Sequence, residues 1–227
     1  MRERALSLHR AISREVPSLG DFLPSAAPES SPGAVALWPK AGIPVVPCRA
    51  CAGATPPFDA ARSLFAYAGG ARAAIVAAKY SGRPFPVDAA AERLRDALVG
   101  EWSDLFPDGA PPAIVPVPAH PWKYFRRGFN LPALIGVSLG RRLGWPFDPL
   151  LLARGREGIP QAGLRLAERL RNAEGAFRVP RGKAVPPRVL LLDDVLTSGA
   201  TARAAAAALK TAGADHIVVV TLARAAS

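Results

Sequence analysis

Short apolar runs alternate with helical patterns from residue 58 onward. Residues 87–99 place Leu94 and Leu98 four positions apart, on one face of a helix. The runs near the C-terminus are apolar at successive positions, which is typical of strands buried on both faces. We expect strands at 63–68, 113–118, 188–192 and 216–222, and helices at 71–80, 87–99, 131–143 and 200–211. Buried strands alternating with helices predict an α/β fold, a parallel sheet flanked by helices.

The first 57 residues differ in pattern from the rest. Residues 2–16 have the spacing of a short amphipathic helix, and 17–57 are rich in Pro, Ser, Gly and Ala, which predicts irregular structure. We therefore expect two parts, an N-terminal segment at 1–57 and an α/β domain at 58–227. Within that domain, 154–171 is highly charged and predicts a long loop, or a loop with a surface helix.

Composition narrows the classes of partner. The chain has 227 residues, 50% of them hydrophobic, which is enough for one sizeable core. Its net charge of +11 favours nucleic acid, phosphorylated metabolites or an anionic membrane surface, and it also fits a solvated basic face. Because no apolar run is long enough to cross a membrane and the start lacks a secretory pattern, we expect no membrane span and a cytoplasmic protein.

Two cysteines, Cys48 and Cys51, stand in a C-x-x-C spacing. This spacing fits half of a zinc site, a redox pair, or a remnant of either. A structural zinc ion needs four ligands, and few other soft ligands are available in this sequence. We therefore do not expect zinc to be bound.

The segment 189–201 carries the strongest chemical signal. An apolar strand is followed by Asp193 and Asp194, then by small and hydroxylated residues, then by a helix. Parallel sheets bind ligands beyond the carboxyl ends of their strands, and a helix N-terminus favours a phosphate. The residues expected to hold that phosphate are Thr197, Ser198, Gly199, Ala200 and Thr201.

The two carboxylates predict a second part of the ligand. Beside a phosphate alone they would only repel, but carboxylates accept hydrogen bonds from sugar hydroxyls. A ribose 5-phosphate therefore fits both halves of the segment. If the ligand is phosphoribosyl pyrophosphate, Mg²⁺ and cationic side chains are also expected.

A family resemblance extends beyond this segment. Residues 189–201 are similar to the phosphoribosyl pyrophosphate signature of type I phosphoribosyltransferases. Further blocks, in order, are Phe65-Ala66-Tyr67 with Gly69-Gly70, Lys79-Tyr80-Ser81-Gly82-Arg83, Val115-Pro116-Val117-Pro118, His120-Pro121, Arg126-Arg127-Gly128-Phe129-Asn130, Gln161-Ala162-Gly163-Leu164, Glu168-Arg169, Arg171-Asn172 and Gly175-Ala176-Phe177. Together they identify the chain as resembling the ComF family, which is linked to natural competence and DNA uptake.

The resemblance implies a type I phosphoribosyltransferase-like fold and roles for particular residues. Asp193 and Asp194 would hold the ribose hydroxyls, and 197–201 the 5-phosphate. Arg126 and Arg127 would face pyrophosphate, since guanidinium groups suit phosphate oxygens; a solvated basic turn is the alternative. Residues 154–172 would close over the substrate, with Arg169 and Asn172 as candidates; a basic surface helix fits equally well.

The chain departs from the family at its N-terminal segment. ComF-family proteins commonly begin with a zinc-finger-like module that has two C-x-x-C pairs, and only Cys48 and Cys51 are present here. The segment 1–57 is therefore expected to be a degenerate zinc-finger-like module.

Three functions remain open on the sequence. The first is transfer of a phosphoribosyl group to an amine or nucleobase, for which no catalytic side chain is identified; His120 beside prolines is more typical of a structural histidine. The second is a non-catalytic accessory protein that binds single-stranded DNA through basic and aromatic residues, with Trp122, Tyr124 and Phe125 as candidates. The third is a ribose-phosphate sensor that controls a partner protein.

Overall fold

The computed structural model describes residues 56–80, 85–107, 109–155 and 175–225. Its elements are β1 (Ala60–Ala66), α2 (Gly69–Tyr80), α3 (Val87–Val99), η3 (Ser103–Leu105), β2 (Ala113–Pro116), α4 (Pro121–Arg127), α5 (Leu131–Leu143), β3 (Ala153–Arg154), β4 (Phe177–Arg178), β5 (Arg188–Leu196), α7 (Ala200–Thr211) and β6 (His216–Arg224). The expectations for 2–16, Cys48, Cys51, Arg169 and Asn172 lie outside the described residues. The division at residue 57 stays a prediction.

A four-stranded parallel sheet forms the centre of the fold. The strand order is β1-β6-β5-β2, and all three neighbouring pairs are parallel. In register, Leu190 of β5 lies between Ile114 of β2 and Val218 of β6. The expected α/β class with a parallel sheet flanked by helices is confirmed.

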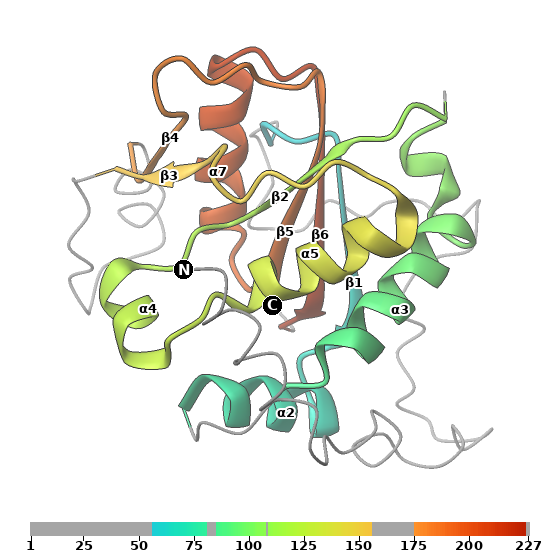
Figure 1. Cartoon of the computed structure of the whole chain (residues 1–227). Helices are drawn as coiled ribbons and strands as arrows, with labels where there is room; N and C mark the ends of the chain where they lie inside the picture. Colours follow the sequence, from blue (N-terminus) through green and yellow to red (C-terminus); the bar gives the residue numbers. More distant parts are fainter. Residues whose placement is uncertain (1–55, 81–84, 108, 156–174, 226–227) are drawn as a thin grey trace.

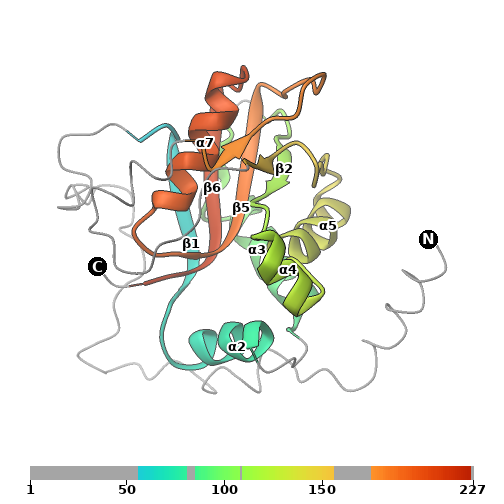
Figure 2. The same ribbon diagram turned by 90° about the vertical axis from the view of Figure 1, so that its left-hand side faces the viewer.

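Both faces of the sheet are buried, as the apolar strands predict. Leu190 and Leu192 pack in the core beneath α3 and α5, whereas Val189 and Leu191 pack beneath α7. All four side chains are 0% exposed, which is why β5 shows no polar alternation before its acidic residues. Figures 1 and 2 show α7 on one side of the sheet and α5 on the other.

Strand β5 is longer than the sequence predicts. The acidic pair suggests a strand end at Leu192, yet Asp193 pairs with Thr221 and Val195 pairs with Ala223 of β6. Pairing with a long parallel neighbour outweighs the weak strand preference of aspartate. As a consequence, the two carboxylates stand on a rigid strand rather than on a loop.

A polar loop was expected after β2, but the structure has a helix there, so this expectation is wrong. Helix α4 begins at Pro121, a residue well suited to the first helical position. The Nδ1 atom of His120 accepts the Trp122 backbone N–H at 3.3 Å, and Gly128 ends the helix in the left-handed conformation with φ 76°. The cap and the left-handed glycine together define this one short helix.

Two smaller differences concern the neighbours of the sheet. Gly69 and Gly70, expected to precede α2, form its first turn. Arg154, expected in a charged loop, pairs with Phe177 in a two-stranded antiparallel sheet of β3 and β4.

In the part of the chain that the structure describes, no helix combines the length and apolarity needed to span a membrane.

The close packing of α5 on β2 generates a stability prediction. A Cβ added at Gly136 would lie 2.7 Å from Cε2 of Phe147 and 3.4 Å from Cγ2 of Ile114. Gly136→Ala should therefore lower the free energy of unfolding by about 1–3 kcal/mol, despite the better helix propensity of alanine. Urea denaturation measures this change. Arg141→Ala, on an exposed position of the same helix, should stay within about 0.5 kcal/mol of wild type.

Candidate functional site

A solvent-open cleft lies at the carboxyl ends of β2 and β5. The space inside it, part of which is open solvent, is about 780 Å³. The last turn of α2, the turn after β2, the start of α5 and β3 contribute to its wall, and Asp193 and Asp194 line it from β5. We call this cavity the main cleft. It lies where parallel α/β sheets bind their ligands.

Asp193 is the most perturbed acid of the main cleft. Burial, followed by the neighbouring Asp194 carboxylate, raises the pKa of Asp193 to about 7, while Lys79 and Arg154 act in the opposite direction. Its Oδ1 atom accepts the backbone N–H of Asp194 at 2.8 Å. At neutral pH this carboxyl is therefore divided between its protonated and ionised forms.

Asp194 faces a cation from a distant part of the chain. The Nζ atom of Lys79 lies 2.7 Å from Oδ2 of Asp194, and the two side chains are only 16% and 19% exposed. A lysine in the last turn of α2 also suits the negative end of the helix dipole. This half-buried ion pair ties α2 to the end of β5.

Arg154 supplies a second cation from the opposite wall. Its Nε donates to the Pro118 carbonyl oxygen at 3.1 Å, and its guanidinium carbon lies 4.8 Å from the centre of the Phe177 ring. Burial lowers the pKa of Arg154, and the charge of Asp193 partly restores it. Arg154 is thus fixed in place before any ligand arrives.

The predicted phosphate loop joins β5 to α7. Gly199 caps the helix with φ 76°, a left-handed conformation that residues with a Cβ rarely adopt. The Oγ atom of Ser198 lies 3.5 Å from the Ala200 backbone nitrogen, and Thr201 lines the main cleft. Of residues 197–201, only Thr201 lines the main cleft, and the side chains of Thr197 and Ser198 are exposed to solvent.

The structure separates the two arginines that the sequence paired. Arg127 lines the main cleft, and its guanidinium carbon lies 5.1 Å from the centre of the Tyr80 ring. Arg126 does not line the main cleft; it lies 4.7 Å over Trp122. The pyrophosphate role stays a prediction, and placement in the main cleft favours Arg127 for it.

Sequence reasoning missed two cations of the site, Lys79 and Arg154. Lys79 was visible as the first residue of a family-like block, but only the fold brings it to Asp194. Arg154 was read as part of a charged loop, because nothing local marks its contact with Pro118. Asn130 was missed as well, and its Nδ2 donates to the Val117 carbonyl oxygen at 3.0 Å, which holds the turn after β2.

The described residues offer a divalent cation a partial site. No three His, Cys, Asp or Glu side chains gather among them. Mg²⁺ is commonly held by one or two carboxylates with substrate phosphates and water, and Asp193 and Asp194 fit that smaller set. Within the described part of the chain, Mg²⁺ at this pair would need further ligands such as water or phosphate oxygens.

Several proteins resemble this chain in sequence. DNA utilization protein YhgH of Salmonella typhi is 30% identical over 199 residues, or 84% of this chain and 85% of that protein. Competence protein F of Haemophilus influenzae is 36% identical over 117 residues, 51% of each chain. Competence protein ComFC of Streptococcus pneumoniae is 32% identical over 110 residues, 48% of this chain and 47% of that protein. The matches span about half the length of the two competence proteins.

No family model matches the chain. A crystal structure of adenine phosphoribosyltransferase aligns with 58% of this chain and 69% of its own, at a TM-score of 0.37 and 19% identity. That likeness is too distant to bear on function.

The raised pKa of Asp193 generates a pH prediction. An unfolded aspartate titrates near pH ~3.9, so between that value and about 7 the folded chain binds more protons than the unfolded chain. The stability contributed by Asp193 is therefore fully present below the unfolded pKa and is lost as pH rises through the folded pKa. Asp193→Asn should lack this loss in urea denaturation compared at about pH 5 and about pH 8.

The exposed Asp215 provides the matched control. Asp215→Asn should show the same pH profile as wild type, because its side chain is solvated. Identical profiles for wild type and Asp193→Asn would refute the assigned environment of Asp193.

Proposed function

This chain belongs to the ComF family of competence and DNA-utilization proteins, and on that premise we propose that its main cleft binds phosphoribosyl pyrophosphate or another ribose 5-phosphate. One observation carries the proposal: two carboxylates on the rigid end of β5 stand directly before the glycine-capped N-terminus of α7. One segment therefore carries carboxylates that can accept hydrogen bonds from sugar hydroxyls, followed by helix N–H groups that can donate to a phosphate.

The phosphate end of the ligand fits the start of α7. The first backbone N–H groups of a helix have no partner within the helix, and the helix dipole adds partial positive charge there. The space beside Gly199 is open to a phosphate, since an added Cβ would meet no atom within 4 Å. The positive φ is therefore what disfavours other residues at this position. The 5-phosphate would bind these N–H groups, with Thr201 beside it.

The ribose end fits the two aspartates. Asp194 contacts Lys79 through Oδ2, and Asp193 accepts a backbone N–H through Oδ1. A carboxylate has about four lone-pair positions, so each can accept a further bond from a ribose hydroxyl. Both carboxylates are already held in position, which lowers the entropy cost of binding.

Charge favours a ligand with more than one phosphate. Lys79, Arg127 and Arg154 line the main cleft against Asp193 and Asp194, and Asp193 is only partly ionised at neutral pH. The surplus is positive even before helix α7 is counted. A pyrophosphate beside Arg127, accompanied by Mg²⁺, would balance it.

The same arrangement supports transfer of the phosphoribosyl group to a nitrogen nucleophile, an amine or a nucleobase. The bond from the anomeric carbon to pyrophosphate breaks, its electron pair leaves with pyrophosphate, and the nitrogen forms the new bond. The nitrogen then loses its proton to water or to pyrophosphate. Lys79 and Arg127 would stabilise the charge that develops on the leaving group.

Calorimetric titration of phosphoribosyl pyrophosphate with Mg²⁺ tests the binding proposal. Wild type should bind saturably, and Asp194→Asn should bind at least about tenfold more weakly, because a hydrogen bond to a charged acceptor is lost. Arg127→Ala should lower the affinity for phosphoribosyl pyrophosphate more than the affinity for ribose 5-phosphate, because ribose 5-phosphate lacks the pyrophosphate group.

Matched variants serve as controls in this titration. Asp215→Asn and Arg141→Ala remove the same charges from exposed positions outside the main cleft and should bind as wild type does. Absence of binding to folded wild type would refute the proposal. Binding without pyrophosphate release in the presence of amines and nucleobases would favour a sensor over a transferase.

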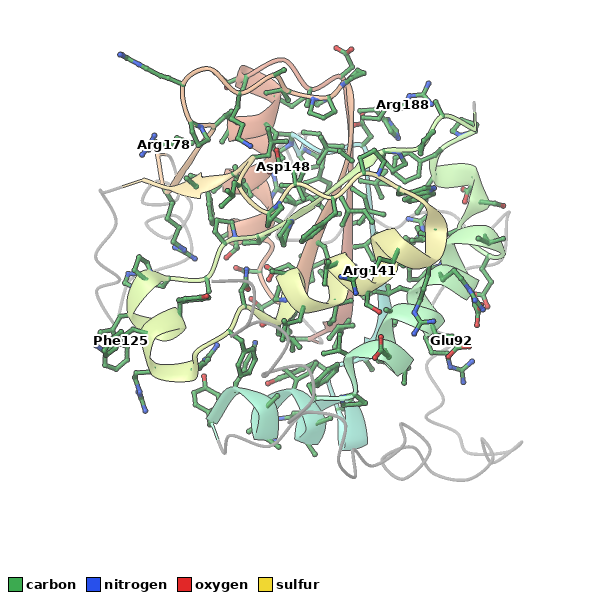
Figure 3. All side chains as sticks on the ribbon, in the orientation of Figure 1. Glu92, Phe125, Arg141, Asp148, Arg178 and Arg188 are labelled. Carbon is green, nitrogen blue, oxygen red and sulfur yellow. The ribbon has the colours of Figure 1, made fainter. Side chains whose placement is uncertain are left out.

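Binding of single-stranded DNA is the second candidate function. The observation that favours it is the set of exposed aromatic side chains on α4, Trp122, Tyr124 and Phe125, beside two arginines, with Phe125 87% exposed and directed away from the sheet (Figure 3). Such side chains stack with bases, and arginines attract the backbone. Binding in this mode should weaken steeply with added salt.

The DNA candidate is tested by a fluorescence-anisotropy titration of a single-stranded oligonucleotide at two salt concentrations. A double substitution of Tyr124 and Phe125 by alanine should reduce the affinity by about tenfold or more if both stack with bases. Unchanged affinity in this variant would exclude Tyr124 and Phe125 as residues that stack with DNA bases.

A further inference from the structure

A second cavity, whose space including open solvent is about 620 Å³, lies beside the main cleft. The C-terminal turn of α2 forms one side of it and α4 forms the other. Lys79, Tyr80, Arg127 and Phe129 line both cavities, so the two share a wall. We call the second one the side cavity. A molecule held there would lie next to whatever occupies the main cleft.

The side cavity differs from the main cleft in chemistry. No carboxylate lines it among the described residues, and Asp193 and Asp194 face only the main cleft. Tyr80 and Trp122 are 70% and 60% exposed and offer aromatic faces. Among the described residues, such a wall offers no carboxylate to hold a metal ion and presents mainly aromatic faces and N–H donors.

Guanidinium groups are already stacked on these aromatic faces. The guanidinium carbon of Arg126 lies 4.7 Å from the Trp122 ring centre, and that of Arg127 lies 5.1 Å from the Tyr80 ring centre. Each arginine thus makes a cation–π contact with a ring, and its guanidinium N–H groups are hydrogen-bond donors beside that ring. A flat ligand can extend the stack and receive these donors at its own edge.

We propose that the side cavity binds the acceptor of the phosphoribosyl group, and that this acceptor is a nucleobase carrying carbonyl oxygens. The inference rests on the proposed function, because the side cavity gains this role only from a ribose phosphate in the main cleft. An aromatic ring stacks on Trp122, and its ring edge faces the shared wall. A second ring nitrogen, distinct from the one that accepts from the arginines, then points toward the anomeric carbon.

The donors select the kind of base. Lys79, Arg126 and Arg127 supply only N–H donors, and among the described lining side chains only the Tyr80 hydroxyl can accept. Arginine donors match a carbonyl oxygen and an adjacent ring nitrogen, the edge that guanine-type bases present. A base with an amino group at that position would leave donors facing donors. An oxo-substituted base is therefore favoured over its amino counterpart.

The test is calorimetric titration of hypoxanthine and adenine into the protein saturated with phosphoribosyl pyrophosphate in the presence of Ca²⁺ in place of Mg²⁺, to slow turnover. Hypoxanthine should bind at least about tenfold more tightly than adenine. Trp122→Ala should lower the affinity for hypoxanthine by roughly tenfold or more, because one stacking face is removed. The affinity for phosphoribosyl pyrophosphate, measured on the same sample, reports whether the variant is folded.

Phe125→Ala is the matched control, an exposed aromatic on the same helix that lines neither cavity. It should bind hypoxanthine as wild type does. Equal losses in Trp122→Ala and Phe125→Ala would overturn the assignment, as would equal affinity for the two bases. Binding of a single-stranded oligonucleotide but of neither free base would assign the aromatic faces to DNA instead.

The two proposals fail in different ways in this experiment. If phosphoribosyl pyrophosphate does not bind wild type, the proposed function itself is wrong. If it binds and hypoxanthine does not, only the acceptor site is wrong.

Discussion

The ion pair between Lys79 and Asp194 is the contact on which the site depends. It joins the end of α2 to the end of β5, two segments more than a hundred positions apart in the sequence. The Nζ atom of Lys79 lies 2.7 Å from Oδ2 of Asp194, and both side chains are half-buried. Arg154, whose Nε donates to the Pro118 carbonyl oxygen, also lowers the pKa of Asp193 through its charge. Two adjacent carboxylates on one strand would repel each other, and these two cations allow them to remain together at the mouth of the cleft.

The parallel sheet determines where this cluster lies. Strands β2 and β5 run in the same direction, so the turn before α4 and the loop before α7 emerge at one edge. Pairing of β5 with β6 continues past the acids to Leu196 and makes the edge rigid. This edge carries carboxylates that suit hydroxyl groups and a helix N-terminus that suits a phosphate. Cations from other elements lie beside it and suit further negative charge.

Much of this was accessible from the sequence. The apolar runs at 188–192 and 216–222 identified the two central strands, because burial on both faces leaves no polar positions to obscure them. The acids and small residues that follow identified the binding loop. Lys79 and Arg154 were not found, since their partners are distant in sequence and each looks locally like a solvated cation. Helix α4 was missed because its definition depends on the His120 cap and the left-handed Gly128, which are weak signals beside two prolines. The candidates Arg169, Asn172, Cys48 and Cys51 lie outside the described residues and stay predictions.

The most direct test of the account is a crystal structure of the protein with ribose 5-phosphate. The account predicts the phosphate at the backbone N–H groups that begin α7, and ribose hydroxyls about 2.6–3.2 Å from the carboxylate oxygens of Asp193 and Asp194. A phosphate bound against Arg126 and Trp122 instead, with both carboxylates facing solvent, would contradict it.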